Sequence, residues 1–346
     1  MKPILYLILA SLILASCSAQ PSGPQTLTVM THDSFAATDA VIQAFEQANN
    51  AKVNILKSGD AGAALNKAIL SKQAPLADVF YGVDNTFLSR ALAADIYEPY
   101  DASALKQIPS EFQLDPSHRA LPVDSGEVCL VYDKGYFAAH QLAVPKSLED
   151  LTKPEYKDLL VTENPATSSP GLAFLLATIK HYGEANYLGY WKSLRANGLQ
   201  VVDGWEAAYY TNFSGSSGKG PQPLVVSYAT DPAAEVMSAK TPPPDSPVGA
   251  ILGPDTCFRQ IEFVGILKGT KQLSLAQKFV DFMLSAQFQA DMPAQMFVFP
   301  VLPNVALPDA FIKYAPRPTQ PATLAPDDIA RNRDAWIQDW THAVLK

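Results

Sequence analysis

Residues 27–93 alternate short apolar segments with amphipathic ones, and this alternation restricts the fold more than any other feature of the sequence. Strands are predicted over residues 27–32, 52–56 and 77–81, and a turn and a helical pattern follow each of them. Strand–helix alternation of this kind predicts an α/β fold with a mainly parallel sheet.

The turns after these three strands are predicted to form one group of ligand-facing loops. They cover residues 32–35, 59–62 and 82–85. Loops at the carboxyl ends of parallel strands lie along one edge of the sheet, where α/β proteins bind their ligands.

The chain of 346 residues is long enough for two domains, and its 48% hydrophobic and 17% charged residues indicate a well-packed globular protein. A strand predicted over residues 121–133 is long enough to cross between domains, and a strand over residues 257–267 could return the chain. We therefore expect a discontinuous lobe 1 over residues 27–122 and 253–346, including the C-terminal helices, and a lobe 2 over residues 123–252. A hinge between the lobes would leave a ligand cleft.

Two helices are predicted near the C-terminus. The first covers residues 273–292 and begins at a capping Ser274, and the second begins at about residue 326. Trp336 and Trp340 of the second helix lie at helical spacing, so we assign them to the core.

The N-terminus has the pattern of an export signal. Lys2 precedes an apolar run over residues 4–14 that is too short to span a bilayer. Leu14-Ala15-Ser16-Cys17 resembles a bacterial lipobox, which predicts a lipoprotein signal over residues 1–16, acylation of Cys17 and a flexible tether over residues 17–26. Acylation would hold the protein on a membrane surface. A plain signal peptide that happens to contain a cysteine is the alternative.

Two cysteines, Cys129 and Cys257, remain after Cys17. In an exported protein they could form one disulfide, which we favour, but their apolar contexts suit free buried thiols equally well. No cysteine or histidine spacing indicates a metal site. The net charge of −8 argues against nucleic acid as a partner and is compatible with a cationic ligand.

The segment 165–182, PATSSPGLAFLLATIKHY, predicts a loop followed by a buried helix. Ser168 and Ser169 could cap this helix, and Pro170 suits its first turn. Hydroxyl and N–H groups at a helix N-terminus form a seat for a polar or anionic ligand group. The alternative is an ordinary capped helix.

Several longer segments are weak markers singly, but their order and spacing together are specific for one protein family. They are LTVMTHDSF (27–35), ADVFYGVDN (77–85), LVYD (130–133), PATSSPG (165–171), DGWEAAY (203–209), VVSYATDPA (225–233), AQKFVDFMLSAQFQ (276–289), FPV (299–301) and RNRDAWIQDWTHAV (331–344). Together they resemble the thiamine-binding subunits of bacterial ABC importers, within the extracellular solute-binding class that also covers ferric iron and polyamines. The resemblance implies a two-lobe periplasmic-binding-protein (type II) fold without catalytic activity or cofactor. It also implies a monomer that delivers its ligand to an ABC permease and its ATPase.

The resemblance also implies a ligand, which is thiamine, its monophosphate or its diphosphate, and a set of contacts. These contacts are Asp60, Ala61, Ser168, Ser169, Trp205, Tyr228, Ala229, Thr230 and Asp231. The indole of Trp205 suits a thiazolium cation, and the Tyr228 ring could stack on the ligand. Asp60 and Asp231 could bind the aminopyrimidine or offset the cationic ring. A packing role for the tryptophan and turn or cap roles for the aspartates are the alternatives.

The chain departs from this family pattern at several positions. His32 replaces a tyrosine, Ser125 and Glu127 replace an aromatic pair, and Met296-Phe297 replaces an asparagine-tryptophan pair. Ala61 replaces a glycine and Asp231 a serine, so the pocket is expected to have fewer rings and more acidic groups. The further contacts expected are His32, Asp84, Glu127 and Phe297.

Other functions fit parts of the sequence. A ferric-iron protein of the same fold could use the adjacent Tyr209 and Tyr210 as iron ligands, although a helix would point them about 100° apart. His32 is the one obvious further ligand for such an iron. A polyamine-type binding protein would use the same fold. A secreted hydrolase using Ser168 lacks a Gly-x-Ser-x-Gly motif. A structural lipoprotein would need no cleft aromatics.

Overall fold

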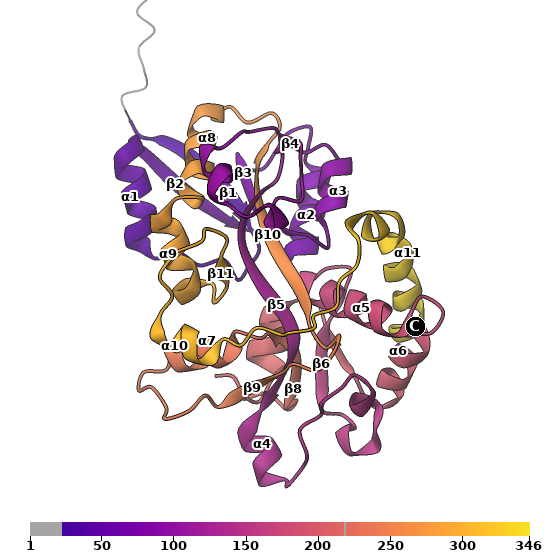
Figure 1. Cartoon of the computed structure of the whole chain (residues 1–346). Coiled ribbons are helices and arrows are strands. Elements are labelled where there is room, and N and C mark those ends of the chain that lie inside the picture. The colour runs from indigo at the N-terminus through magenta and orange to yellow at the C-terminus, as the bar shows by residue number, and fades with distance from the viewer. Residues whose placement is uncertain (1–22, 218) are drawn as a thin grey trace, which may run out of the picture.

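The computed structural model describes residues 23–217 and 219–346 and shows two α/β lobes that are joined by long strands (Figure 1). The predicted signal and the predicted acylation site Cys17 lie outside the described residues. Within the described residues, no helix combines the length and the apolar character that crossing a membrane requires.

Lobe 1 is built from the predicted strand–helix units. Its elements are β1 (Gln25–Thr31), α1 (Asp39–Asn49), β2 (Ala51–Lys57), α2 (Ala61–Leu70), β3 (Val79–Asp84) and α3 (Leu88–Ala93). β1 pairs in parallel with both β2 and β3, which confirms the parallel sheet. β3 runs on to Asp84, so most of the loop that we predicted over residues 82–85 is strand. The reason is that Val83 and Asp84 continue to pair, in antiparallel direction, with the later strand β10 (Phe258–Leu267).

Two long strands connect the lobes. β5 (Leu121–Asp133) and β10 lie antiparallel and pair from Leu121↔Val264 to Val128↔Phe258. Beyond this segment β5 pairs with β8 (Leu224–Tyr228) and β9 (Val248–Ile251). The strand order is therefore β2-β1-β3-β10-β5-β8-β6-β7, one sheet that runs through both lobes.

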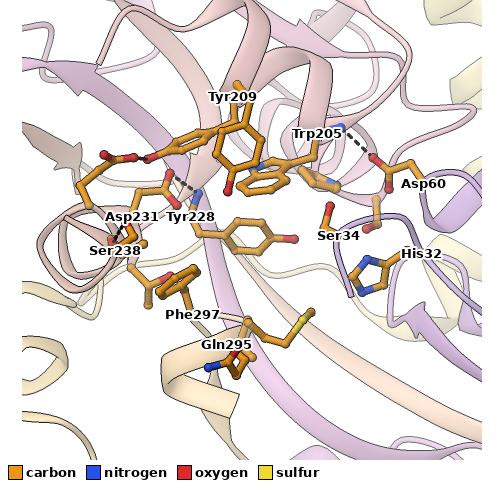
Figure 2. Close-up of a pocket in the computed structure, with 18 of the residues that line it drawn as sticks. His32, Ser34, Asp60, Trp205, Tyr209, Tyr228, Asp231, Ser238, Gln295 and Phe297 are labelled. Carbon is orange, nitrogen blue, oxygen red and sulfur yellow. Dashed lines mark hydrogen bonds between the residues drawn. The ribbon is translucent and has the colours of Figure 1, made fainter. Parts of the chain in front are cut away.

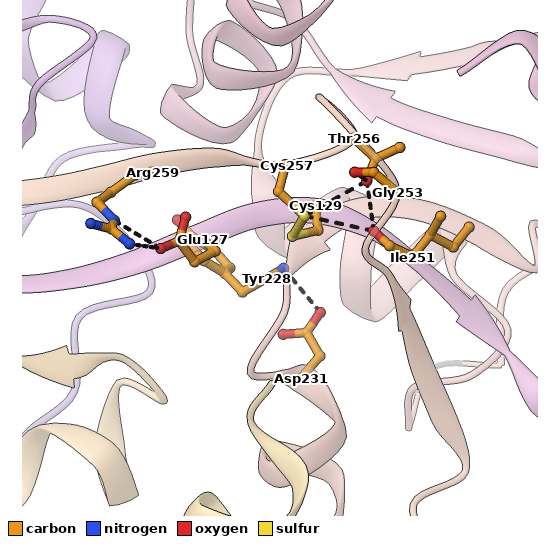
Figure 3. Close-up of a disulfide and its surroundings, with 9 residues drawn as sticks. All are labelled: Glu127, Cys129, Tyr228, Asp231, Ile251, Gly253, Thr256, Cys257 and Arg259. Carbon is orange, nitrogen blue, oxygen red and sulfur yellow. Dashed lines mark hydrogen bonds and ion pairs between the residues drawn. A yellow bond between two sulfur atoms is a disulfide. The ribbon is translucent and has the colours of Figure 1, made fainter. Parts of the chain in front are cut away.

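A disulfide joins Cys129 of β5 to Cys257, the residue directly before β10 (Figure 3). Both cysteines are buried, in a small apolar cluster that also contains Ala229. The structure therefore confirms the bridge that we favoured over free thiols.

Lobe 2 repeats the alternation. Its elements include β6 (Leu160–Glu163), α5 (Ser169–Tyr182), α6 (Tyr187–Ala196), β7 (Gln200–Val202), the π-helical turn η5 (Ala207–Asn212), β8 and α7 (Asp231–Ser238). β6 pairs in parallel with β7 and β8. Residues 169–179 of α5 are all buried, because this helix packs against strands of the sheet and against α6. The shorter elements are β4 (Tyr97–Glu98), α4 (Lys134–Ala139) and the 3₁₀ turns Ser103–Gln107, Ser110–Phe112, Glu149–Thr152 and Pro154–Tyr156.

The C-terminal region differs from the prediction in one helix. The predicted helix over residues 273–292 is two helices, α8 (Leu273–Met283) and α9 (Ala286–Gln295). The break occurs because the Ser285 hydroxyl accepts a hydrogen bond from Phe288 N and starts a new helix. Gln272, not Ser274, precedes the first helical residue of α8. β11 (Phe299–Pro300) and α10 (Asp309–Tyr314) follow.

The last helix, α11 (Pro326–Val344), packs against both lobes (Figure 1). Trp340 lies edge-to-face against Trp191 of α6 with ring centroids 5.4 Å apart, and both are buried, as the prediction for Trp340 required. Arg333 donates a hydrogen bond to Ser89 of α3. α10 packs against α7. The C-terminal helices, which we assigned to lobe 1, therefore also cover lobe 2; the boundaries at residues 122 and 253 stay a prediction.

Candidate ligand-binding site

A cavity of about 370 Å³ lies between the lobes, with aromatic side chains on one wall (Figure 2). Its lining comes from the loops of lobe 1, from lobe 2 and from the segment after α9. The lining residues are His32, Ser34, Asp60, Ser169, Pro170, Trp205, Tyr209, Tyr210, Ser217, Tyr228, Thr230, Asp231, Ala234, Glu235, Ser238, Glu262, Gln295, Met296, Phe297 and Val298.

The loops after β1 and β2 meet at the cavity, as predicted. Asp33 N donates to Gly59 O at 3.1 Å, and Gly59 N donates to the Asp33 carboxylate at 2.7 Å. Gly82 of β3 adopts φ 108°, and a Cβ at this position would lie 2.5 Å from the His32 ring. A glycine is therefore needed beside the histidine, both for the backbone conformation and for space.

Asp60 links the two lobes. It precedes α2, and one carboxylate oxygen accepts from Ala61 N at 2.6 Å while the other accepts from Trp205 N of lobe 2 at 2.8 Å. Ala63 N also donates to Thr167 O at 3.1 Å across the cleft. Asp60 lines the cavity, and each of its carboxylate oxygens accepts a hydrogen bond from the protein backbone. Ala61 is buried and does not line the cavity.

The aromatic wall is centred on Trp205. Its ring stacks on Tyr209 with centroids 5.1 Å apart and an interplanar angle of 12°, and its Nε1 donates to Ser227 Oγ at 2.8 Å. Tyr228 presents its edge to the indole at 6.3 Å. Stacking and hydrogen bonding fix the indole plane, so its free face can receive a flat cationic ring.

Tyr209 and Tyr210 lie in the π-helical turn η5 and both line the cavity. Their ring planes stand at 88° to each other with centroids 5.3 Å apart, which is an edge-to-face contact and does not test the divergence of about 100° that we expected from a helix. Both nevertheless reach the cavity, because Tyr209 packs under Trp205 and Tyr210, 42% exposed, stands at its edge.

The serines of α5 are placed differently from each other. Ser169 lines the cavity, and its hydroxyl accepts from Gln260 Nε2 at 2.8 Å. The Gln260 oxygen in turn accepts from the Tyr228 hydroxyl at 2.7 Å. Ser168 is fully buried and does not line the cavity, and its part as a ligand contact stays a prediction. It makes no side-chain cap bond, so the predicted capping role of this serine is wrong. Ala229 is also buried outside the lining, among the residues around the disulfide.

Carboxylates stand at both ends of the cavity. At the α7 end, Asp231 accepts from Tyr228 N at 3.2 Å, and Glu235 accepts from the Tyr209 hydroxyl at 2.8 Å. Burial raises the pKa of Asp231 to about 8 and also raises the pKa of Glu235. Thr230, directly before α7, completes this end of the lining.

At the other end, Glu262 of β10 lies 3.6 Å from His32 Nε2 and 2.9 Å from the Tyr81 hydroxyl. Tyr81 also lies 2.5 Å from Asp124. A phenol has a single proton, so one of the two carboxyl contacts of Tyr81 requires a protonated acid. Burial, together with the charge of Glu262, raises the pKa of Asp124.

Two other expected contacts lie away from the cavity lining. Asp84 is fully buried and accepts from Thr86 Oγ1 at 2.7 Å, and burial raises its pKa to about 7. Glu127 forms an ion pair with Arg259 at 2.8 Å (Figure 3). Asp84 lies in β3 and Glu127 in β5, and as ligand contacts both stay predictions.

Phe297 does line the cavity, and its backbone is unusual. It adopts φ 55°, a left-handed conformation that is rare for a bulky residue. The sulfur of the neighbouring Met296 accepts a hydrogen bond from Ala36 N at 3.1 Å, so residues 296–297 contact lobe 1. A non-glycine residue held in this conformation lowers the stability of the fold by about 1–3 kcal/mol, and such residues occur most often at functional sites.

Sequence reasoning missed two acidic lining residues that periodicity could have found. Glu235 follows Asp231 by four residues in α7 and therefore shares its face. Glu262 follows Gln260 by two residues in β10 and therefore points to the same side of the sheet. No such pattern marks Gln295 or Ser217, which reach the cavity only through the tertiary fold.

A family model described as "Bacterial extracellular solute-binding protein" matches residues 74–320. The chain belongs to this family. It is 33% identical over 339 residues to a thiamine-binding periplasmic protein of Salmonella typhimurium, covering 96% of this chain and 98% of the relative. It is 31% identical over 328 residues to a thiamine-binding periplasmic protein of Brucella suis, covering 93% and 92%. These relatives are periplasmic, and membership makes this chain an exported solute-binding protein.

Solved structures agree with the solute-binding fold. A "Periplasmic thiamin binding protein" superposes with a TM-score of 0.82 at 30% identity, covering 93% of this chain and 97% of the other. A ferric binding protein from Campylobacter jejuni has the same fold, with a TM-score of 0.73 at 20% identity, covering 92% and 99%. The two-lobe type II fold is thereby confirmed, and the ferric-iron alternative is not favoured.

Proposed function

We propose that this solute-binding protein captures thiamine in the cavity between its lobes. The observation that carries the proposal is the Trp205–Tyr209 stack, whose centroids lie 5.1 Å apart, facing a cavity that also contains Asp231 and Glu235. A fixed aromatic face together with carboxylates is suited to a flat organic cation. The thiamine-binding relatives, which align with almost the whole chain, narrow the cation to thiamine.

In this proposal the thiazolium ring packs on the Trp205 face, beside Tyr228 and Phe297. Asp231 and Glu235 offset its charge. Ser169 and Thr230 offer hydroxyl groups for the polar ends of the ligand, and His32 borders the lobe 1 side. Asp60 accepts from Ala61 and Trp205 and so holds the closed arrangement, and its remaining lone pairs can still accept from the aminopyrimidine.

Delivery to an ABC permease and its ATPase completes the proposed function. Closing on the ligand would shift the population toward a closed state, which the permease then distinguishes from the empty open state. Acylation of Cys17 would keep the monomeric protein at the membrane surface beside this permease. No cofactor and no catalytic step are part of the proposal.

Isothermal titration with thiamine tests the proposal. Separate titrations with putrescine and ferric citrate test the polyamine and iron alternatives. We expect a 1:1 thiamine complex and no heat from the other two. Trp205→Ala should weaken thiamine binding by about tenfold or more, because it removes the stacking face. Trp336→Phe, in the core of α11, is the control and should leave the affinity unchanged. Absence of heat with thiamine would overturn the ligand assignment.

A further inference from the structure

Carboxyl groups are the main ionisable side chains around the cavity. Asp60, Asp231, Glu235 and Glu262 line it, and no lysine or arginine is among the described lining residues. His32 is the one lining side chain that could become cationic, and it lies 3.6 Å from Glu262, which would take up its charge. An anionic ligand group would therefore meet carboxylates without a basic partner.

Helix N-termini, the usual alternative seats for phosphate, are also altered here. α7 begins with Asp231-Pro232 at the cavity, so a carboxyl group occupies its first turn and the second position has no N–H. α5 begins with Ser169-Pro170, so its second position also lacks an N–H, and both residues line the cavity. A phosphate approaching α7 would lie against the Asp231 carboxyl instead of free amide donors.

We propose that this cavity selects its ligand by charge: it takes an organic cation without an anionic substituent and disfavours phosphate esters of that cation. Resting on the proposed function, this means that thiamine is bound in preference to thiamine monophosphate and diphosphate. Asp231 and Glu235 are the specificity-determining residues. They lie one helical turn apart on α7 and both face the cavity, so they act on the same part of the ligand.

The volume supports the same selection. The cavity of about 370 Å³ already has aromatic or acidic side chains at each of its ends. A phosphate group at a carboxylate-lined end either meets charge repulsion and loses its hydration there or keeps the cleft from closing. Either outcome lowers the affinity for the ester relative to the alcohol.

The experiment compares dissociation constants for thiamine, its monophosphate and its diphosphate by isothermal titration at pH 8.5, above the pKa of about 8 of Asp231. For the unaltered protein we expect thiamine to bind at least about tenfold more tightly than either ester. Asp231→Asn and Glu235→Gln should each weaken thiamine binding and reduce the preference several-fold, since each removes one repulsive charge. Glu184→Gln removes one exposed carboxylate outside the cavity and should leave the preference unchanged.

Equal or tighter binding of the monophosphate by the unaltered protein would overturn charge selection while leaving thiamine capture intact. Failure of thiamine itself to bind would overturn the proposed function instead, so the two failures are distinguishable. The comparison of ligands on the unaltered protein decides the question even if a variant does not fold.

Discussion

The carboxylate of Asp60, at the start of α2 in lobe 1, accepts a hydrogen bond from the backbone N–H of Trp205 in lobe 2 at 2.8 Å. Gly204 makes this contact possible, because a Cβ there would lie 3.2 Å from the same carboxylate. The backbone of Trp205 is thus hydrogen-bonded directly to lobe 1, so that closing the cleft also orients the indole ring.

Asp60→Ala should weaken thiamine binding by about tenfold to a hundredfold. The variant loses a hydrogen bond to a charged acceptor, which contributes roughly 1.5–3 kcal/mol. Asp60→Asn is the matched control, because its amide oxygen can still accept from Trp205 N, and it should retain most of the affinity. Titration calorimetry on both variants measures the effect. Equal losses in the two variants would show that the charge matters rather than the link between the lobes.

Thiamine affinity should rise between pH 6 and pH 8. The pKa of Asp231 in the empty cavity is raised to about 8 by burial, so the group carries a proton below that pH. A bound cation stabilises the ionised form, so binding releases the proton, and the affinity rises with pH until the free pKa is passed. The groups around Asp231 are Glu235, Glu163 and Tyr209, all with raised pKa values. Titrations in buffers of different ionisation enthalpy measure the proton release.

Asp231→Asn provides the control for this pH dependence and should flatten it. The contribution of Asp231 to the free energy of unfolding falls as the pH rises, whereas the thiamine affinity rises. A folded pKa above the unfolded one stabilises the protein fully below the unfolded pKa of 3.8, and this contribution is lost as the pH rises through about 8. The variant should therefore gain stability relative to the unaltered protein between pH 5 and pH 9 in urea unfolding. An unchanged difference between these pH values would contradict the assigned protonation of Asp231.

Phe297→Gly should be more stable than Phe297→Ala by about 1 kcal/mol, although glycine normally costs stability. The reason is that residue 297 adopts φ 55°, which glycine accepts and alanine resists. Both variants lose the ring and should bind thiamine less tightly by a similar factor. Urea unfolding separates the two effects. If alanine were the more stable replacement, the left-handed conformation would not be a property of the protein in solution.

Reduction of the Cys129–Cys257 disulfide should lower the free energy of unfolding by roughly 2–5 kcal/mol. The bridge spans 128 residues of sequence, and a long loop constrains the unfolded chain most strongly. Urea unfolding with and without a phosphine reductant gives the difference. Cys257→Ser should show the lower stability in both conditions and no response to reductant. An equally stable reduced protein would show that the packing of the two lobes suffices.

Local patterns in the sequence determined the elements of the fold. Strand–helix alternation predicted the parallel sheet of lobe 1, and the strand-like segment over residues 121–133 predicted β5 at the residues where it occurs. These predictions succeed because the periodicity of a buried face is a property of neighbouring residues. The helix over residues 273–292 failed, since one capping serine at 285 outweighed a continuous helical pattern.

The site depended more on tertiary structure. Resemblance and local chemistry identified Trp205, Tyr228 and Asp231, which line the cavity, but could not show that Ser168, Asp84 and Glu127 lie outside its lining. The antiparallel pairing of β5 with β10 places Glu262 beside the cavity, and the packing of the end of α9 places Gln295 there. The cavity brings together residues more than 100 positions apart, such as His32 and Glu262. No local pattern encodes such contacts, because they form when the lobes and the crossing strands pack together.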